Sequence, residues 1–197
     1  FQQMTSTDSA IAYEQHAEEF LHARDGSVIG TEVLQTWCAS LSPDAEVLEL
    51  ACGGGLPVTR ILQNAGLRGW AIDSSPTLLA QFQQRFPTTT AECARVQDSL
   101  FFSRSFDAVL AIGLLFLLKE SDQVDLIRRV AARLKIGGRF LFTAPTQRCE
   151  WTDATTGIVS YSLGQDAYAA CLQSFGLSLV HCLVDEGGNH YYEAQRL

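Results

Sequence analysis

The stretch EVLELACGGG, residues 46–55, decides the fold class of this chain. Residues 46–51 form a short, mostly apolar run that is typical of a buried strand, with Glu46 at its start and Glu49 inside it. Three glycines then turn the chain, and Pro57 follows in a position that suits the first turn of a helix. A strand, a glycine turn and a helix in this order predict the first unit of a parallel sheet covered by helices.

The same alternation continues along the chain. Further strands are expected at 69–72, 93–96, 106–112, 139–143, 177–184 and 190–196, and further helices at 75–86, 124–134 and 167–175. The five residues 185–189 that separate the last two strands are too few for a crossover helix, so the last strand must run antiparallel. The sequence therefore predicts an α/β fold with a Rossmann-like, doubly wound, seven-stranded sheet that is mostly parallel and has an antiparallel last strand.

Length and composition favour a single domain over residues 1–197. Of the 197 residues, 47% are hydrophobic and 18% are charged, which is ordinary for a globular domain with one core. Residues 1–3 precede Met4 and resemble a remnant of recombinant expression, so Met4 is expected to be the natural start. Two helices are expected within residues 9–41, at 9–23 and 31–41, and together they are predicted to form an N-terminal helical lid.

Charge and cysteine usage argue against several classes of partner. The chain has 14 Lys and Arg against 22 Asp and Glu, a formal net charge of −8, so a nucleic-acid partner is not expected. The longest apolar run, 108–118, is shorter than the roughly 20 residues of a bilayer span, so no membrane partner is expected. The six cysteines follow no zinc-binding spacing, which predicts free thiols in a cytoplasmic protein and no metal. No pattern in the sequence defines an oligomeric state.

Three acidic residues associated with successive strands point to a nucleotide-like ligand, because ligands of open parallel sheets lie at the carboxyl ends of the strands. Glu49 is either a solvated strand-end acid or a buried carboxylate that a cationic ligand group would explain. Asp73 lies 18 residues after Gly55, close to the roughly 20-residue interval of a ribose-binding acid, and also suits a helix N-cap. Asp98 is either an adenine-binding residue or a plain loop residue.

The glycine turn does not fit a dinucleotide site. A GxGxxG fingerprint laid on Gly53 and Gly55 needs a third glycine where Val58 stands. An amino-acid tail at Glu49, a ribose at Asp73 and an adenine at Asp98 suit S-adenosylmethionine better than a pyrophosphate-linked cofactor.

Five segments, taken in order, are similar to the motifs of class I S-adenosylmethionine-dependent methyltransferases of the small-molecule type. They are VLELACGGG at 47–55, WAID at 70–73, VQDS at 96–99, SFDAV at 105–109 and LKIGGRF at 134–140. The resemblance runs from about Tyr13 to the end of the chain. It departs from the family at Ala51, where a glycine is usual, and at Ser74, where an apolar residue commonly lies against adenine. Residues 112–115 lack the Asn/Asp-Pro-Pro-aromatic signature of enzymes that methylate amino groups of bases or glutamine.

The resemblance implies transfer of a methyl group from S-adenosylmethionine to an O, N, S or C nucleophile of a small-molecule acceptor, with release of S-adenosylhomocysteine. It also implies a set of cofactor-binding residues: Glu49 for the methionine ammonium, Ala51, Cys52, Gly53 and Gly55 for the methionine part, Asp73 for the ribose hydroxyls, Ser74, Asp98 and Ser99 for adenine, and Ile112 and Gly113 beneath the sulfonium.

Aromatic and histidine side chains lie in segments that the topology brings to the acceptor side. The predicted acceptor-pocket residues are Tyr13, Trp151, Tyr161, His190 and Tyr191. Adjacent residues of a strand face opposite sides of the sheet, so at most one of Tyr191 and Tyr192 points into a pocket. A histidine near its ordinary pKa of about 6.5 can act as a general base at neutral pH, which makes His190 or His16 the candidate catalytic residue.

Two other functions are compatible with the same architecture, because one fold hosts many activities. One is an NAD(P)-dependent oxidoreductase on a Rossmann-type sheet. The other is a non-catalytic module that binds S-adenosylmethionine without turnover.

Overall fold

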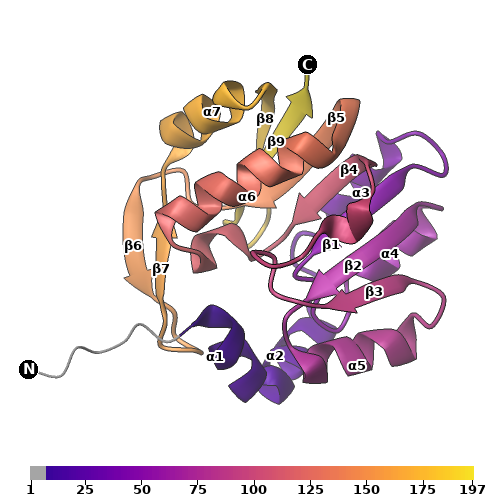
Figure 1. The fold of residues 1–197 in the computed structure, drawn as a ribbon. Coiled ribbons are helices and arrows are strands. Elements are labelled where there is room, and N and C mark those ends of the chain that lie inside the picture. Colours follow the sequence, from indigo (N-terminus) through magenta and orange to yellow (C-terminus); the bar gives the residue numbers. More distant parts are fainter. Residues whose placement is uncertain (1–7) are drawn as a thin grey trace, which may run out of the picture.

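The structure, a computed structural model, describes residues 8–197, and its centre is a seven-stranded sheet with the order β3-β2-β1-β4-β5-β9-β8 (Figure 1). The strands are β1 (Glu46–Leu50), β2 (Arg68–Asp73), β3 (Thr90–Cys93), β4 (Phe106–Ala111), β5 (Leu134–Thr143), β8 (Leu177–Val184) and β9 (His190–Arg196). Neighbours from β3 to β5 pair in parallel, whereas β9 lies antiparallel between β5 and β8. The predicted seven-stranded sheet with an antiparallel last strand is confirmed.

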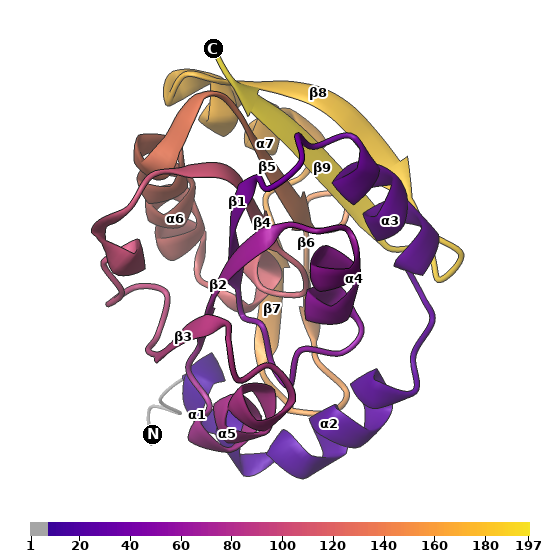
Figure 2. The same ribbon diagram turned by 90° about the vertical axis from the view of Figure 1, so that its right-hand side faces the viewer.

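Helices cover both faces of the sheet (Figure 2). They are α1 (Ser9–Gln15), α2 (Ala17–Asp25), α3 (Thr31–Ala39), α4 (Val58–Asn64), α5 (Pro76–Arg85), α6 (Glu120–Arg133) and α7 (Gln165–Ser174), with single 3₁₀ turns at η1 (Phe101–Ser103) and η2 (Leu115–Leu117). Because side chains of a strand alternate, Val47 of β1 packs with α3 and α4, whereas Leu48 packs with α6 and α7. No helix within residues 8–197 has the length and apolar character that a membrane span requires.

Three local predictions were wrong. The expected strand 93–96 lies at Thr90–Cys93, because the chain turns away from β2 after Cys93. The expected helix 9–23 is interrupted at His16, whose φ of −112° and ψ of 19° end α1 and begin α2. The segment after β5, expected to be a loop, contains a hairpin of β6 (Cys149–Thr152) and β7 (Val159–Ser162), two strands too short and too polar to give a hydrophobic alternation. Residues 1–3 and Met4 lie outside the described residues.

Candidate functional site

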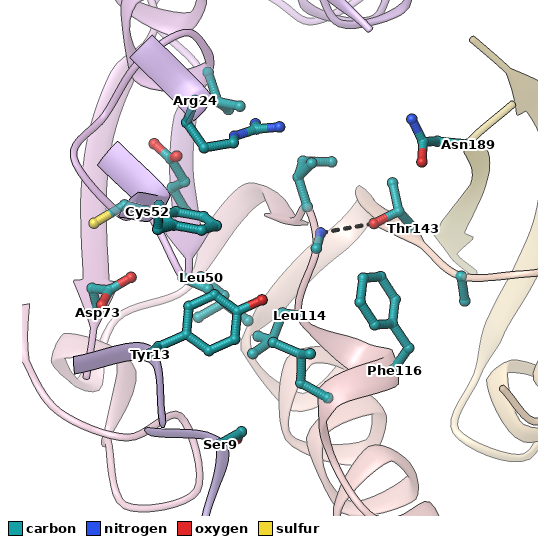
Figure 3. A pocket seen from close by; sticks show the side chains of 18 of the residues that line it. Ser9, Tyr13, Arg24, Leu50, Cys52, Asp73, Leu114, Phe116, Thr143 and Asn189 are labelled. Atoms are coloured by element: carbon teal, nitrogen blue, oxygen red, sulfur yellow. Dashed lines mark hydrogen bonds between the residues drawn. The ribbon is translucent and has the colours of Figure 1, made fainter. Parts of the chain in front are cut away.

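A cavity of about 550 Å³ lies at the carboxyl ends of β1, β2, β4 and β5 (Figure 3). Its volume is in the range of small-molecule sites. Its wall combines the loops after these strands with side chains of α1 and α2, the β6–β7 hairpin and the start of β9. The site therefore lies where the topology of the sheet predicts a ligand.

The glycine turn after β1 is held by backbone conformation and by packing. Gly55 has a φ of +87°, and a Cβ atom there would lie 2.3 Å from the Phe86 ring, so this position requires glycine because α5 packs against it. Ala51 adopts a left-handed φ of 57°, which places an ordinary residue where the family usually has glycine. Of the residues in this turn, Ala51, Cys52 and Gly54 line the cavity.

Glu49 and Arg24 bring an acidic and a basic side chain into one cavity. The Glu49 side chain is 4% exposed and accepts a 2.5 Å hydrogen bond from Thr59 Oγ1. Burial raises the pKa of Glu49 to about 8, although the Thr59 hydrogen bond and the positive charge of Arg24 oppose this shift. Arg24, in the last turn of α2, points into the cavity, and its guanidinium group makes no hydrogen bond or ion pair with residues 8–197 (Figure 3). A buried acid and an unpaired guanidinium suit the two ends of an amino-acid group.

Asp73 joins the glycine turn to the start of α5. Its Oδ2 accepts a hydrogen bond from the Gly53 amide and its Oδ1 accepts one from the Ser75 amide, both at 2.8 Å. Burial raises the pKa of Asp73, and these amide hydrogen bonds oppose the shift. Asp73 is not the N-cap of α5, because Ser75 Oγ accepts from the Leu78 amide at 3.1 Å and fills that role.

A second, smaller cavity of about 40 Å³ adjoins the first. The two cavities share Ala51, Asp73 and Ser74, and the smaller one continues past them to Val96 and Gln97. A ligand long enough to reach from Glu49 past Asp73 would therefore end against Val96 and Gln97.

The N-terminal helices are fastened over the glycine turn at two points. Glu14 of α1 accepts hydrogen bonds from the Ser75 and Thr77 hydroxyls at the start of α5, which lower its pKa. Asp25, at the end of α2, pairs with Arg85 of α5 at 2.5 Å. Both contacts hold the N-terminal helices against α5.

The opposite wall of the cavity is aromatic and lies beside the loop after β4. The ring centroids of Phe116 and Trp151 are 5.5 Å apart, at an interplanar angle of 44°. Thr143 Oγ1 accepts a 2.8 Å hydrogen bond from the Gly113 amide, which fixes the turn after β4 (Figure 3). His190, at the start of β9, also lines the cavity.

Eleven of the residues predicted from the sequence line this cavity: Tyr13, Glu49, Ala51, Cys52, Asp73, Ser74, Ile112, Gly113, Trp151, His190 and Tyr191. Tyr191 packs with α3 and α4, whereas Tyr192 packs in the core on the other face, so just one of the two tyrosines faces the cavity, as expected.

Six predicted residues lie outside the lining: His16, Gly53, Gly55, Asp98, Ser99 and Tyr161. The Asp98 side chain is 71% exposed beside Arg95, and the Ser99 amide donates to the Arg95 carbonyl at 3.1 Å. His16 lies 3.7 Å from Glu19 on the N-terminal helices. Tyr161 pairs across the hairpin with Glu150, one position away from Trp151, so it projects from the opposite side of the hairpin.

Other residues of the lining did not emerge from the sequence, among them Arg24, Phe116, Thr143 and Asp153. Arg24 carried a signal that could have been used, since it is the only Lys or Arg among the first 59 residues. The positions of Phe116 and Asp153 in the lining depend on η2 and on the β6–β7 hairpin, and neither element gave a recognisable pattern in the sequence. Among residues 8–197, no group of three His, Cys, Asp or Glu side chains is placed to hold a metal ion.

Comparisons with known proteins agree with the fold. The sequence model of a family described as "Methyltransferase domain" matches residues 47–138. A search of curated protein sequences gave no match.

Three solved structures illustrate the structural similarity. Magnesium protoporphyrin IX methyltransferase from Synechocystis PCC 6803, with bound S-adenosylmethionine, has 15% identity and a TM-score of 0.64 over 99% of this chain and 87% of that chain. An S-adenosylmethionine-dependent methyltransferase from Mesorhizobium loti has 18% identity and a TM-score of 0.67 over 87% of this chain and 99% of that chain. The Burkholderia thailandensis 1,6-didemethyltoxoflavin-N1-methyltransferase, with bound 1,6-didemethyltoxoflavin and S-adenosylhomocysteine, has 16% identity and a TM-score of 0.69 over 100% of this chain and 93% of that chain.

Proposed function

We propose that the chain is a class I S-adenosylmethionine-dependent methyltransferase that methylates a small-molecule acceptor, a proposal supported by the methyltransferase family model over residues 47–138 and by the shared fold. The observation that carries this proposal is the placement of the buried Glu49 carboxyl group and the unpaired Arg24 guanidinium in one cavity. Such a pair matches the ammonium and carboxylate of a methionine group, and a nicotinamide dinucleotide carries no group of this kind. Two of the structural neighbours act on small organic molecules, which supports an acceptor of the same class.

We assign the parts of the cofactor to residues in the order in which the cavity presents them. Glu49 would hold the ammonium and Arg24 the carboxylate of the methionine part. Asp73 would hold the ribose at the boundary between the two cavities, and Ser74 and Val96 would enclose the adenine. This assignment replaces Asp98 and Ser99 as adenine-binding residues, because neither lines either cavity.

The residues around the turn after β4 align the reaction. A lone pair of the acceptor would attack the methyl group that S-adenosylmethionine would supply at this site, with S-adenosylhomocysteine as the leaving group. The turn at Gly113, fixed by Thr143, forms a rigid floor, and the N-terminal helices exclude water. His190 lies on the cavity wall and can take a proton from the acceptor, whereas His16 lies outside the lining, so we assign the general base to His190.

The direct test of the proposed function is isothermal titration with S-adenosylmethionine and S-adenosylhomocysteine. We expect micromolar binding of both, at least tenfold weaker binding to Arg24→Gln, and unchanged binding to the matched control Arg128→Gln, whose arginine is exposed on α6 and pairs with Asp125. Binding of NADH in place of both ligands would reject the proposal. Formation of S-adenosylhomocysteine with an acceptor panel then separates an enzyme from a binding module.

The ion pair between Asp25 of α2 and Arg85 of α5 allows a test of whether the N-terminal helices contribute to binding of S-adenosylmethionine. If they form a lid, Asp25→Asn removes the 2.5 Å contact with Arg85 and favours the open state. Because the pair is partly exposed, we expect a loss of about 1 kcal/mol, equivalent to roughly fivefold weaker binding of S-adenosylmethionine. The control is Glu18→Gln, an exposed acid on α2. Equal affinities of the two variants, measured by titration, would contradict a lid held by this ion pair.

A further inference from the structure

The hairpin that closes the cavity carries a carboxylate with one free oxygen. Asp153 Oδ1 accepts hydrogen bonds from the Thr155 amide at 3.0 Å, the Thr156 amide at 2.7 Å and the Thr156 hydroxyl at 2.8 Å, whereas Oδ2 accepts none from the described residues. Asp153 lines the cavity, and its negative charge raises the pKa of the neighbouring Tyr13 phenol, after the larger effect of burial. Figures 1 and 2 place the turn of this hairpin close to the N-terminal helices, in agreement with this proximity. The turn is thus held by Oδ1, and Oδ2 remains available to a ligand.

The other acidic side chains of the cavity already accept hydrogen bonds from the protein or are assigned to the methionine part of the cofactor. Asp185 accepts hydrogen bonds from the Gly187 and Asn189 backbone, the Asn189 side chain and the Tyr191 hydroxyl. These hydrogen bonds outweigh burial and lower the pKa of Asp185. Asp73 is bonded to two amides, and Glu49 belongs to the methionine end. Asp153 is therefore the carboxylate that remains for the acceptor.

An aromatic wall lies next to this carboxylate. Trp151, in β6, and Asp153, one residue beyond the end of β6, both line the cavity. Phe116 of η2 packs against Trp151, with ring centroids 5.5 Å apart. Flat aromatic faces favour planar rings and attract positive charge.

Positive charge is scarce on this side of the cavity. Arg24 is the one Lys or Arg among the described lining residues, and the proposed function assigns it to the methionine carboxylate. A carboxylate or phosphate on the acceptor would therefore meet Asp153 without a counterion. The negative charge of Asp153 and the flat aromatic faces of this wall therefore favour a positively charged ligand with a planar ring.

We propose that the acceptor is a planar aromatic compound that bears a positively charged amine, with its ring against Phe116 and Trp151 and its ammonium group at Asp153 Oδ2. This inference rests on the proposed function, because it takes the remainder of the cavity as the acceptor site.

The test compares tryptamine with indole-3-propionate, which share a ring and a side-chain length but carry opposite charges. In titrations of protein saturated with S-adenosylhomocysteine, we expect tryptamine to bind at least tenfold more tightly. In Asp153→Asn, which keeps the Oδ1 acceptor of the turn, this preference should fall below threefold. Trp151→Ala should weaken both compounds by a similar factor. Asp166→Asn, an exposed acid at the start of α7, removes the same charge outside the cavity and should keep the full preference.

Equal affinities, tighter binding of the anion, no binding of tryptamine at millimolar concentration, or an unchanged preference in Asp153→Asn would overturn the acceptor inference. Failure of S-adenosylhomocysteine itself to bind is seen in the first titration and counts against the proposed function. In that case the preference for tryptamine, measured on the free protein, still decides whether Asp153 forms a cation-selective site.

Discussion

Replacing Asp73 with alanine is expected to abolish measurable binding of S-adenosylmethionine and to destabilise the fold. The Gly53 and Ser75 amides both donate to this carboxylate at 2.8 Å, and Asp73 is 7% exposed. Without it, two buried amides lose their acceptor at a cost of about 1–3 kcal/mol each, which corresponds to a fall in Tm of about 5–15 °C. Titration at a temperature where the variant is folded measures binding, and thermal unfolding followed by circular dichroism measures the fall in stability.

The matched control for this prediction is Asp98→Ala. Asp98 follows the next strand and is 71% exposed, and sequence reasoning alone gives it a place in the same site. We expect its affinity for S-adenosylmethionine to stay within twofold of the native protein and its Tm to stay unchanged. An Asp73→Ala variant that binds within threefold of the native protein would show that Asp73 organises the turn without holding the cofactor.

The affinity for S-adenosylmethionine is expected to rise by up to tenfold per pH unit between pH 6 and pH 8. Burial raises the pKa of Glu49 to about 8, so in the free protein this carboxyl group is mostly protonated at neutral pH. An ammonium group needs the carboxylate, so binding below pH 8 must release about one proton. Above pH 8 the rise should stop, because an α-amino group begins to lose its own proton at about that pH.

Titration calorimetry in buffers of different ionisation enthalpy measures the released proton directly. Glu49→Gln should bind at least a hundredfold more weakly and should release no proton. The matched control is Glu92→Gln on β3, an acid that lines neither cavity and should keep the pH dependence of the native protein. An affinity that does not change between pH 6 and pH 8 would show that Glu49 does not bind the ammonium in its charged form.

The same group makes stability depend on pH in the absence of ligand. The native state keeps the Glu49 proton up to about pH 8, whereas the unfolded chain loses it near the ordinary value of 4.5. Between these values the native state binds more protons, so the free energy of unfolding falls as pH rises. Glu49→Gln should remove this contribution and raise the Tm at pH 8 by several degrees, in thermal unfolding without cofactor.

The sheet could be predicted because its signals are local. The run 46–51 with its glycine turn, and the short connection 185–189, predict a parallel sheet with one antiparallel strand, and this sheet is confirmed. Glu49 and Asp73 could be placed for the same reason, since each is tied to the end of a strand.

The remaining features depend on contacts between distant parts of the chain. Arg24 lies in a helix with only a weak apolar pattern, and only the packing of α2 on α5 turns it toward Glu49. Asp98 was expected at the site because the third strand was placed three residues too late. Trp151 and Tyr161 are both aromatic residues in the segment after β5, and the sequence gives no reason to prefer one of them as a lining residue. The register of the β6–β7 hairpin places their side chains on opposite sides, so that only Trp151 faces the cavity.

The position of β9 has a consequence for synthesis of the chain. β9 lies between β5 and β8 and pairs with both, so the sheet has a gap one strand wide until residues 190–196 are available. A ribosome delivers β5 and β8 first, and the edges of both strands face this gap while the nascent chain is still attached. β9 is therefore the strand that completes the sheet, and it brings His190 and Tyr191 to the cavity in the same step. Translation that stops shortly before His190 should yield a chain with open strand edges, which is prone to aggregation and to capture by chaperones.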